Sequence, residues 1–292
     1  MQEFLTNVGK SALGSWWHVL WVSAVFLALE LLWPASRYSM KSRIRAGMFW
    51  AIYYVITMAF FTAFLPLWSR LGIKPLFALN LEPIGTSHYW PVKVLGWIAA
   101  PLIAGAVSEF FYYWFHRAQH SFAWMWRFHS VHHSLREMSA FNSNHHFTEE
   151  ILRIPFILVP MTFLIGVTTG PTLLVLTILI RMQGQFEHSC TKINLGIFRY
   201  LVADNRFHRI HHSLEQRHWN RNFGSFMPLW DIVFRTATFP RKGEWPPVGL
   251  DHVDEPKTIN DFLFRPFLPD RPSAPIATEE GTTLQPSARQ ST

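Results

Sequence analysis

The chain has 292 residues, of which 49% are hydrophobic, 16% aromatic and only 15% charged, and its mean hydropathy is positive. This composition is too apolar for a water-soluble domain of this length and indicates an integral membrane protein. Lysine and arginine outnumber aspartate and glutamate by 26 to 19, but no basic helix or nucleic-acid motif accompanies the excess, which excludes nucleic acid and favours anionic lipid headgroups.

Three apolar stretches are long enough to cross a bilayer as helices, which takes about 20 residues each. They occupy residues 15–33, 47–68 and 93–115. The first is not predicted to be a cleaved secretory signal, because its apolar part is long and no small-residue cleavage pattern follows it. Residues 151–180 form a fourth apolar block that three prolines and two glycines interrupt. This block is too short for two full spans and predicts a tight helical hairpin.

The basic residues of the short loops predict the orientation. The loop between the first two stretches carries Arg37, Lys41, Arg43 and Arg45, whereas residues 69–92 are poorer in positive charge. Loops rich in lysine and arginine stay in the cytoplasm. Counting onward through the spans, we expect all residues that follow the third span, except the hairpin itself, to lie on the cytoplasmic side.

The chain divides into three parts by composition. Residues 1–92 hold the N-terminal membrane helices and loops, and residues 93–240 hold the third span and the hairpin. Residues 241–292 form a C-terminal extension whose last stretch is rich in proline, serine and threonine and has no periodicity. Such a composition predicts a disordered tail.

Histidines cluster in the middle part of the chain. Seven of the fifteen lie between residues 116 and 146 and five between residues 188 and 218. Imidazole is the commonest metal-binding side chain, and it is neutral at cellular pH at little cost. The single cysteine, Cys190, allows neither an internal disulfide nor a thiolate cluster. Any metal is therefore expected to be held by histidine.

The spacing of the histidines indicates more than one metal ion. Positions three or four apart share a helical face, whereas adjacent residues diverge by about 100°. Each doubled histidine can therefore address two different ions, and the eight imidazoles exceed the about four ligands that one ion such as zinc takes. Two metals are the economical inference. The eight candidates are His116, His120, His129, His132, His133, His208, His211 and His212.

Further candidates lie around these eight. His146 and His188 are predicted as additional ligands, and whether His145 or His146 takes the role stays open. Two carboxylates are candidate catalytic residues. Glu109 lies inside the third span, where a charge is costly, and is expected to orient a metal ligand or to pair with an arginine. Glu149 is expected to hydrogen-bond a ligating imidazole or to be solvated.

The ordered pattern H-x3-H, H-x2-HH and H-x2-HH resembles the fatty acid hydroxylase and sterol desaturase superfamily of integral-membrane oxygenases. The resemblance covers about residues 93–236 and includes WRFHSVHHS at 126–134, HRIHHS at 208–213 and NFGSFMPLWDIVFRT at 222–236. It implies an all-α, four-helix membrane bundle with a cytosolic histidine-lined cap that holds two non-haem iron ions. Zinc can substitute for iron in a purified protein.

The resemblance assigns the histidines to three boxes and one isolated position. The first box is His116 and His120, and His188 matches the isolated histidine that follows the hairpin. The second box is His129, His132 and His133, and the third is His208, His211 and His212. Many relatives have His-Pro-x-Glu after the second box, where this chain has Phe147 in place of proline between His146 and Glu149.

The expected function is hydroxylation, or desaturation, of an unactivated C–H position in a lipid. The lipid could be a fatty acyl chain, a sterol, a carotenoid or an aminolipid. The reaction would use O2 and electrons from a separate ferredoxin- or cytochrome-type carrier, because no haem- or flavin-binding motif is present. Two alternatives remain open, which are a divalent-metal transporter with a cytosolic histidine site and a membrane zinc hydrolase.

Overall fold

The computed structural model describes residues 1–251, 253–268, 276–277 and 283–284. Three long helices dominate it, α1 (Gln2–Leu32), α2 (Met40–Ser69) and α4 (Trp90–Ser121), and each is long and apolar enough to cross a membrane. Of the most apolar 18-residue segment of each helix, at most 33% is buried inside the protein. Helices that are apolar all round and yet uncovered are suited to contact with lipid. The expected all-α membrane class is thereby confirmed.

The helical hairpin completes the bundle. Its first arm consists of α6 (Thr148–Arg153), the π-helical turn η1 (Ile154–Leu158) and α7 (Val159–Leu164), and its second arm is α8 (Leu173–His188). The π-helical turn contains Pro155, which has no N–H to donate and so disturbs the regular ladder. The apolar block is therefore a hairpin, as the sequence predicts.

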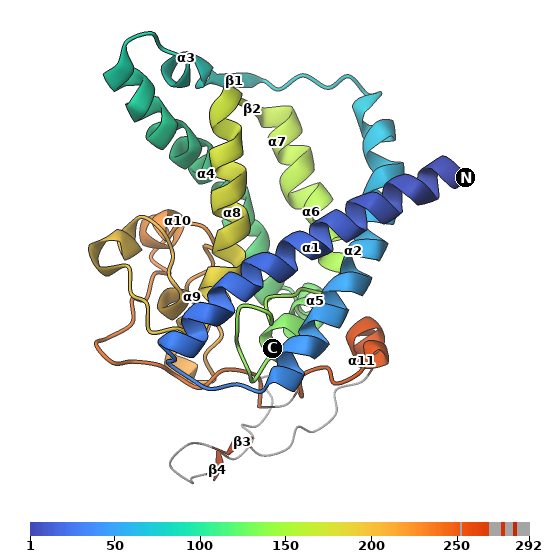
Figure 1. Cartoon of the computed structure of the whole chain (residues 1–292), viewed down its shortest axis with the longest axis vertical. Helices are drawn as coiled ribbons and strands as arrows, with labels where there is room; N and C mark the ends of the chain where they lie inside the picture. Colours follow the sequence, from blue (N-terminus) through green and yellow to red (C-terminus); the bar gives the residue numbers. More distant parts are fainter. Residues whose placement is uncertain (252, 269–275, 278–282, 285–292) are drawn as a thin grey trace.

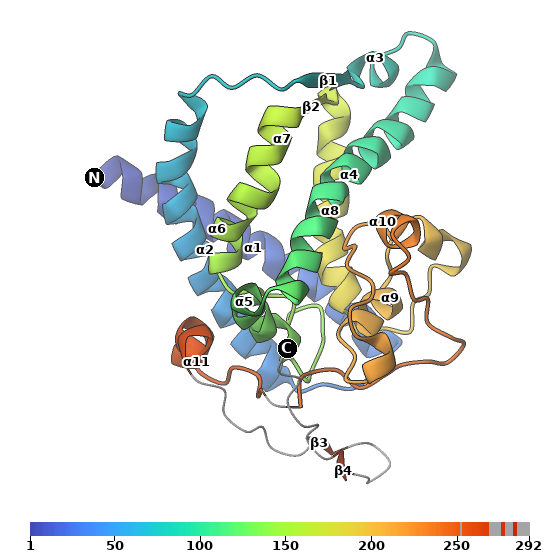
Figure 2. The same ribbon diagram turned by 180° about the vertical axis from the view of Figure 1, so that it is seen from behind.

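The tip of the hairpin meets the connection between α2 and α4. Strand β2 (Ile165–Thr168) pairs in parallel with β1 (Phe77–Asn80), with Phe77 opposite Ile165. The short helices α3 (Glu82–Gly85) and η2 (Gly170–Thr172) lie beside the pair. Figures 1 and 2 show this contact at one end of the bundle and the short helices α5 (Ala123–His133) and α9 (Asn205–His211) at the other. This strand pair was not predicted, because four residues of apolar sequence do not distinguish a strand from a helical turn.

Short helices and loops form a cap at the end of the bundle opposite β1 and β2. α4 is about 48 Å long at 1.5 Å per residue, against about 30 Å of hydrocarbon, so its last turns can extend beyond a bilayer core. The elements of the cap are α5 (Ala123–His133), η3 (Gly196–Tyr200), α9 (Asn205–His211), η4 (Gln216–His218) and α10 (Leu229–Val233). The Asp204 side chain caps α9 by accepting a hydrogen bond from Phe207 N at 2.8 Å.

A buried ion pair fastens α1 to the cap. Glu30 Oε2 lies 2.7 Å from Arg43 Nη2, and both side chains are at most 5% exposed. Glu30 Oε1 accepts hydrogen bonds from Ala140 N at 2.9 Å and Cys190 N at 3.0 Å. One carboxylate therefore ties α1 and α2 to the loop that follows α5 and to the segment that follows α8.

The C-terminal extension packs against the cap through α11 (Ile259–Phe264), which η5 (Arg265–Phe267) follows. Phe262 is fully buried and stacks on Phe49 at 4.7 Å between ring centroids. The pair β3 (Ile276–Ala277) and β4 (Thr283–Leu284) is antiparallel. Most of the predicted disordered tail, residues 269–275, 278–282 and 285–292, lies outside the described residues.

Candidate metal centre

Four helices deliver nine histidines to the interior of the cap. α4 supplies two from its last turns, α5 three, α8 one from its last residue, and α9, with the residue that follows it, three. All nine are buried except His120, which is half-buried. Their nitrogen atoms fall into two groups, each with all its candidate ligand atoms within 4.8 Å of one another. The first group is His116, His120, His129, His133 and His211, and the second is His132, His188, His208 and His212.

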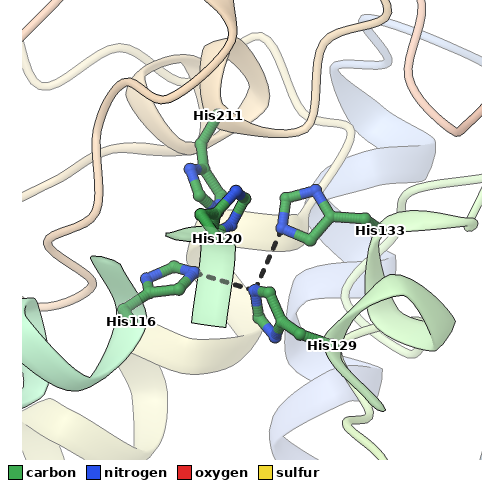
Figure 3. Close-up of side chains that lie close together, drawn as sticks. All are labelled: His116, His120, His129, His133 and His211. Atoms are coloured by element: carbon green, nitrogen blue, oxygen red, sulfur yellow. Dashed lines mark hydrogen bonds between the residues drawn. The ribbon is translucent and has the colours of Figure 1, made fainter. Parts of the chain in front are cut away.

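The first group joins the end of α4 to α5 and α9, as Figure 3 shows. His129 Nε2 lies 2.9 Å from His116 Nε2 and 3.1 Å from His133 Nε2. His116 and His120 share one face of α4, and His129 and His133 share one face of α5, because residues four apart are neighbours on a helix. His211 of α9 closes the group, with its ring 4.4 Å from that of His116.

The second group joins α5 to α8 and α9. His188 Nε2 lies 3.1 Å from both His132 Nε2 and His208 Nε2. His212 Nε2 lies 3.2 Å from His208 Nε2. These four imidazoles match the number of ligands that a tetrahedral site needs.

Each doubled histidine is divided between the two groups. His133 and His211 belong to the first group, and their neighbours His132 and His212 belong to the second. The rings of His132 and His133 are 88° apart in plane, and those of His211 and His212 are 87° apart. Such a division follows from the rotation of about 100° per residue around a helix.

Backbone carbonyls fix the orientation of the rings. Nδ1 lies 2.7 Å from the Phe223 carbonyl in His116, 2.7 Å from that of Arg221 in His211 and 2.8 Å from that of Gly184 in His188. A carbonyl oxygen only accepts, so each Nδ1 carries the hydrogen and each Nε2 presents a lone pair. A hydrogen bond from the ring nitrogen that does not bind the metal is the usual way in which proteins orient a metal-binding histidine.

The resulting lone pairs point toward neighbouring imidazoles of the two groups. His132 Nδ1 faces the Asn144 carbonyl at 3.3 Å and His129 Nδ1 faces the Glu149 carboxylate at 3.2 Å, so these rings also turn lone pairs inward. Nε2 of His120 and Nε2 of His211 are buried and have no hydrogen-bond partner among the described residues. Two such lone pairs face each other between His116 and His129 at 2.9 Å in the first group, and two between His132 and His188 at 3.1 Å in the second. They repel one another unless a cation joins them. Both groups therefore fit metal ions.

Burial keeps these imidazoles in the form that binds metal. Desolvation lowers the pKa of His132, His133, His208 and His212 well below its ordinary value, and the neighbouring imidazoles lower it further. The same burial lowers the pKa of His211 to about 3. A neutral imidazole offers a lone pair and a protonated one does not. The cap thus presents neutral ligands at neutral pH.

Glu149 lies where the sequence suggested, against a candidate ligand. Its Oε2 is 3.2 Å from His129 Nδ1 and 3.0 Å from His145 Nδ1, and it accepts a hydrogen bond from Gln119 Nε2 at 2.7 Å. The carboxylate therefore orients His129, a member of the first group, and is not itself a member of the groups of five and four. With His129 and His145 it forms a third, adjoining set of possible metal-binding atoms. Gln119 was not singled out from the sequence, because a glutamine at the end of an apolar helix carries no signal of its own.

The structure corrects the prediction for His146. Its Nδ1 lies 2.7 Å from Thr148 Oγ1 and its Nε2 3.2 Å from the Leu263 carbonyl of α11, so it belongs to neither group. His145 takes the inward place, with its ring stacked on that of His132 at 3.8 Å. The two residues lie in a non-helical segment, and their side chains meet different neighbours, the His132 ring and the Leu263 carbonyl.

Glu109 is buried, and none of its hydrogen bonds within the described part of the chain reaches an imidazole. Its Oε1 accepts hydrogen bonds from Ser225 N at 2.5 Å and Phe226 N at 2.9 Å. It thereby holds the segment whose Phe223 carbonyl orients His116, so its effect on a ligand is indirect and involves no arginine. Glu187 was not predicted from the sequence. Its Oε1 lies 3.8 Å from His188 Nδ1, and its Oε2 lies 3.7 Å from His208 Nδ1. Its position next to His188 was the available signal.

A cavity of about 680 Å³ leads from the bundle to these groups. Residues of α2, α4, α8 and the first arm of the hairpin line it. His145 and His188 form part of its wall at the cap end. A ligand in the cavity can therefore reach the second group from the side of the membrane helices.

Comparisons with known proteins agree with the earlier resemblance. The family model "Fatty acid hydroxylase" matches residues 101–236, which include all nine grouped histidines. "Protein CER1-like 1" of Arabidopsis thaliana is 27% identical over 176 residues, covering 56% of this chain and 27% of its own length. "Ornithine lipid hydroxylase OlsE" of Rhizobium tropici is 28% identical over 167 residues, covering 56% of this chain and 49% of its own. The match thus spans half or less of either relative. No solved structure matches the chain significantly.

Proposed function

The chain belongs, through residues 101–236, to the fatty acid hydroxylase and sterol desaturase superfamily, and from this premise we propose that it is a membrane-bound, di-iron lipid hydroxylase. One observation carries the proposal, which is the convergence of nine imidazoles in two groups at the inner end of a cavity between apolar helices. The name of the family model that matches this chain and that of the ornithine lipid hydroxylase point to the same kind of reaction.

Iron is the metal that we propose for both groups. Nitrogen ligands suit iron, zinc, copper and nickel alike, so the choice of iron rests on the family. When bound, two iron ions would supply the reductive activation of O2 that an unactivated C–H bond requires. Hydroxylation places one oxygen atom in the C–H bond, and the second leaves as water with two electrons from a carrier and two protons.

The residues of the chain have three tasks in this reaction. The nine imidazoles hold the metals, and Glu149 and the carbonyls around the cap fix the directions of the rings. The cavity holds the lipid and admits it from the side of the helices. Because the histidines are almost fully buried, bulk water is kept away from the reacting carbon, which limits side reactions.

The location and the partner are part of the proposal. The positive charge of the loop between α1 and α2 supports a multi-pass protein whose histidines face the cytoplasm. Electrons would come from a separate ferredoxin- or cytochrome-type protein that docks on the cap. The substrate is a membrane lipid, and hydroxylation is favoured over desaturation by the family name and by that of the ornithine lipid hydroxylase.

Two other functions are less well supported. A metal transporter needs ligands near the middle of the membrane, whereas these imidazoles gather in the cap at one end of the helices. A zinc hydrolase needs one ion and three protein ligands, and nine imidazoles in two groups exceed that need.

Lipid analysis of expressing cells tests the proposal. Cells with the unaltered chain should contain a lipid that is heavier by one oxygen, and cells with His132→Ala should lack it. His88→Ala is the control, because His88 is exposed and lies in the connection between α3 and α4. Figure 1 shows α3 at the end of the bundle away from α5 and α9. The purified protein should contain about two iron ions per chain. An active purified enzyme without iron, or undiminished product from His132→Ala, would contradict the proposal.

A further inference from the structure

The wall of the cavity changes from apolar to polar toward the histidines. α2, the first arm of the hairpin and α8 all show this change along their length. The part far from the histidines is lined by Phe61, Leu65, Ile157, Leu158, Met161 and Ile180. The part near them is lined by Tyr53, Glu109, Glu150, Arg153, Gln183 and Glu187. The change occurs on three separate elements, so it is a property of the cavity and not of one helix.

The direction of the change is fixed by contacts with the cap. On α2, Trp50 Nε1 donates to the Phe141 carbonyl at 3.2 Å and the Tyr53 hydroxyl donates to Glu150, so this part of α2 adjoins the cap. Leu65 lies twelve residues later, about 18 Å along the helix axis. On α8, Ile180 lies eight residues before His188, or about 12 Å away. The apolar half therefore points away from the metal groups.

The polar half contains a charged pair with spare donor capacity. Arg153 Nη1 lies 2.7 Å from Glu150 Oε1, and its guanidinium stacks over the Tyr112 ring at 5.6 Å. Arg153 Nε has no hydrogen-bond partner among the described residues. An uncompensated polar group costs free energy when water is displaced, so the pair favours a ligand with polar atoms of its own.

The charged pair lies close to the metal groups. Glu150 follows Glu149, whose carboxylate contacts His129 and His145. Arg153 lies four residues after Glu149 on the same helical arm, about 6 Å along the axis. A polar group held by Glu150 and Arg153 is thus separated from a carbon at the metals by only a few bonds.

The polar half leaves one acceptor, on Glu150, and one donor, on Arg153, open to a ligand. Three carboxyl groups line it, those of Glu109, Glu150 and Glu187, and Arg153 is the one lysine or arginine among the described lining residues. The carboxyls of Glu109 and Glu187 already accept hydrogen bonds from the segment around Ser225. Glu150 uses Oε1 for its contacts with Tyr53 and Arg153, so its Oε2 stays open as an acceptor. A head group that presents an N–H or O–H donor to Glu150, such as an amine, and an acceptor atom to Arg153 Nε complements this wall.

We propose that the cavity binds a donor-bearing, polar-headed lipid with its head toward the metal groups and its tail toward Phe61, Leu65 and Met161. The inference rests on the proposed function and adds the class of the substrate and its direction of binding. The oxidised carbon then belongs to the head group or to the first few carbons beside it. The middle and the far end of the tail lie too far from the metal groups to be oxidised.

A series of probes with one chain length tests the binding mode. A long-chain primary amine, the corresponding alcohol and the corresponding alkane would be bound to the purified full-length protein in micelles, with native mass spectrometry as the measurement. The amine should bind about tenfold more tightly than the alkane, as one charge-assisted hydrogen bond implies, with the alcohol between them. Equal binding of all three, or tightest binding of the alkane, would overturn the proposal.

A variant and a product analysis complete the test. Glu150→Gln should remove most of the preference for the amine, whereas Glu3→Gln, at an exposed position in the first turn of α1, should keep it. If Glu150→Gln fails to fold, the probe series on the unaltered protein still decides. Fragmentation of the oxygenated lipid should place the new oxygen in the head group or beside it, and a mid-chain or terminal position would refute the inference. Head-group preference without any oxygenated product would instead refute only the proposed hydroxylase function.

Discussion

The division of His211 and His212 between two groups leads to an unequal effect of two neighbouring substitutions. His212 is one of four imidazoles in the second group, so His212→Ala leaves three. His211 is one of five in the first group, so His211→Ala leaves four. Four nitrogen ligands still complete a tetrahedral site, whereas three leave a position open.

The expected size follows from the free energy of metal binding. Four-ligand structural sites bind with about 10 to 16 kcal/mol, or about 3 kcal/mol for each ligand. Loss of one ligand from the second group should therefore weaken binding by roughly a hundredfold. Loss of one of five should weaken it less, because the fifth ligand is beyond what a four-coordinate ion needs.

Metal content after dialysis against a weak chelator measures the difference. The unaltered protein should retain about two ions per chain and His212→Ala about one, as the two groups imply. His211→Ala should retain more than His212→Ala, and His218→Ala, at a buried histidine outside both groups, should match the unaltered protein. Equal loss in the two neighbouring variants, or loss of both ions in each, would refute the assignment of these residues to separate ions.

Three further predictions concern the surroundings of the groups. Glu149→Gln should lower metal affinity about 10- to 100-fold, because the carboxylate orients His129; competition with a chelating dye measures this, and an unchanged affinity would show that the contact is dispensable. Glu30→Gln should lower the free energy of unfolding by about 3 kcal/mol or more, because it leaves Arg43 buried without its partner; a melting temperature equal to that of the unaltered protein would contradict this. For the metal-free protein, stability should fall as the pH drops below about 6.5. Histidines of the unfolded chain bind protons in this range, whereas the buried ones stay neutral, because burial lowers the pKa of His211 to about 3. Thermal melting of the metal-free protein at several pH values tests the sign, and a melting temperature that rises toward acid would be the contrary result.

The spans could be predicted from the sequence, and their ends could not. The apolar stretch at 47–68 marks α2, but the helix begins at Met40, after Ser39 caps it by accepting from Ser42 N at 3.1 Å. The stretch at 93–115 marks α4, which continues to Ser121 and thus includes His116 and His120 on one regular helix. Hydropathy reports contact with lipid, whereas helix ends depend on caps and on the residues beyond the apolar core.

The clustering of the histidines was largely predictable because helical spacing is local. The three boxes, and the separation of neighbours such as His132 and His133, follow from the rotation per residue alone. His188 was identified by its place in the chain and by resemblance. The choice between His145 and His146 was not predictable, because it depends on where a non-helical segment meets α11, whose Leu263 carbonyl faces His146.

The sequence by itself determined that the chain is an apolar helical protein with histidines spaced for two metals, because composition and helical periodicity are properties of short stretches. Only the tertiary structure decided which imidazoles share a group, since His132 and His208 are brought together by the packing of α5, α8 and α9. It also determined the shape and lining of the cavity, because the residues of its polar and apolar halves come from helices far apart in the chain. Contacts between distant segments depend on the whole fold, and no local pattern encodes them.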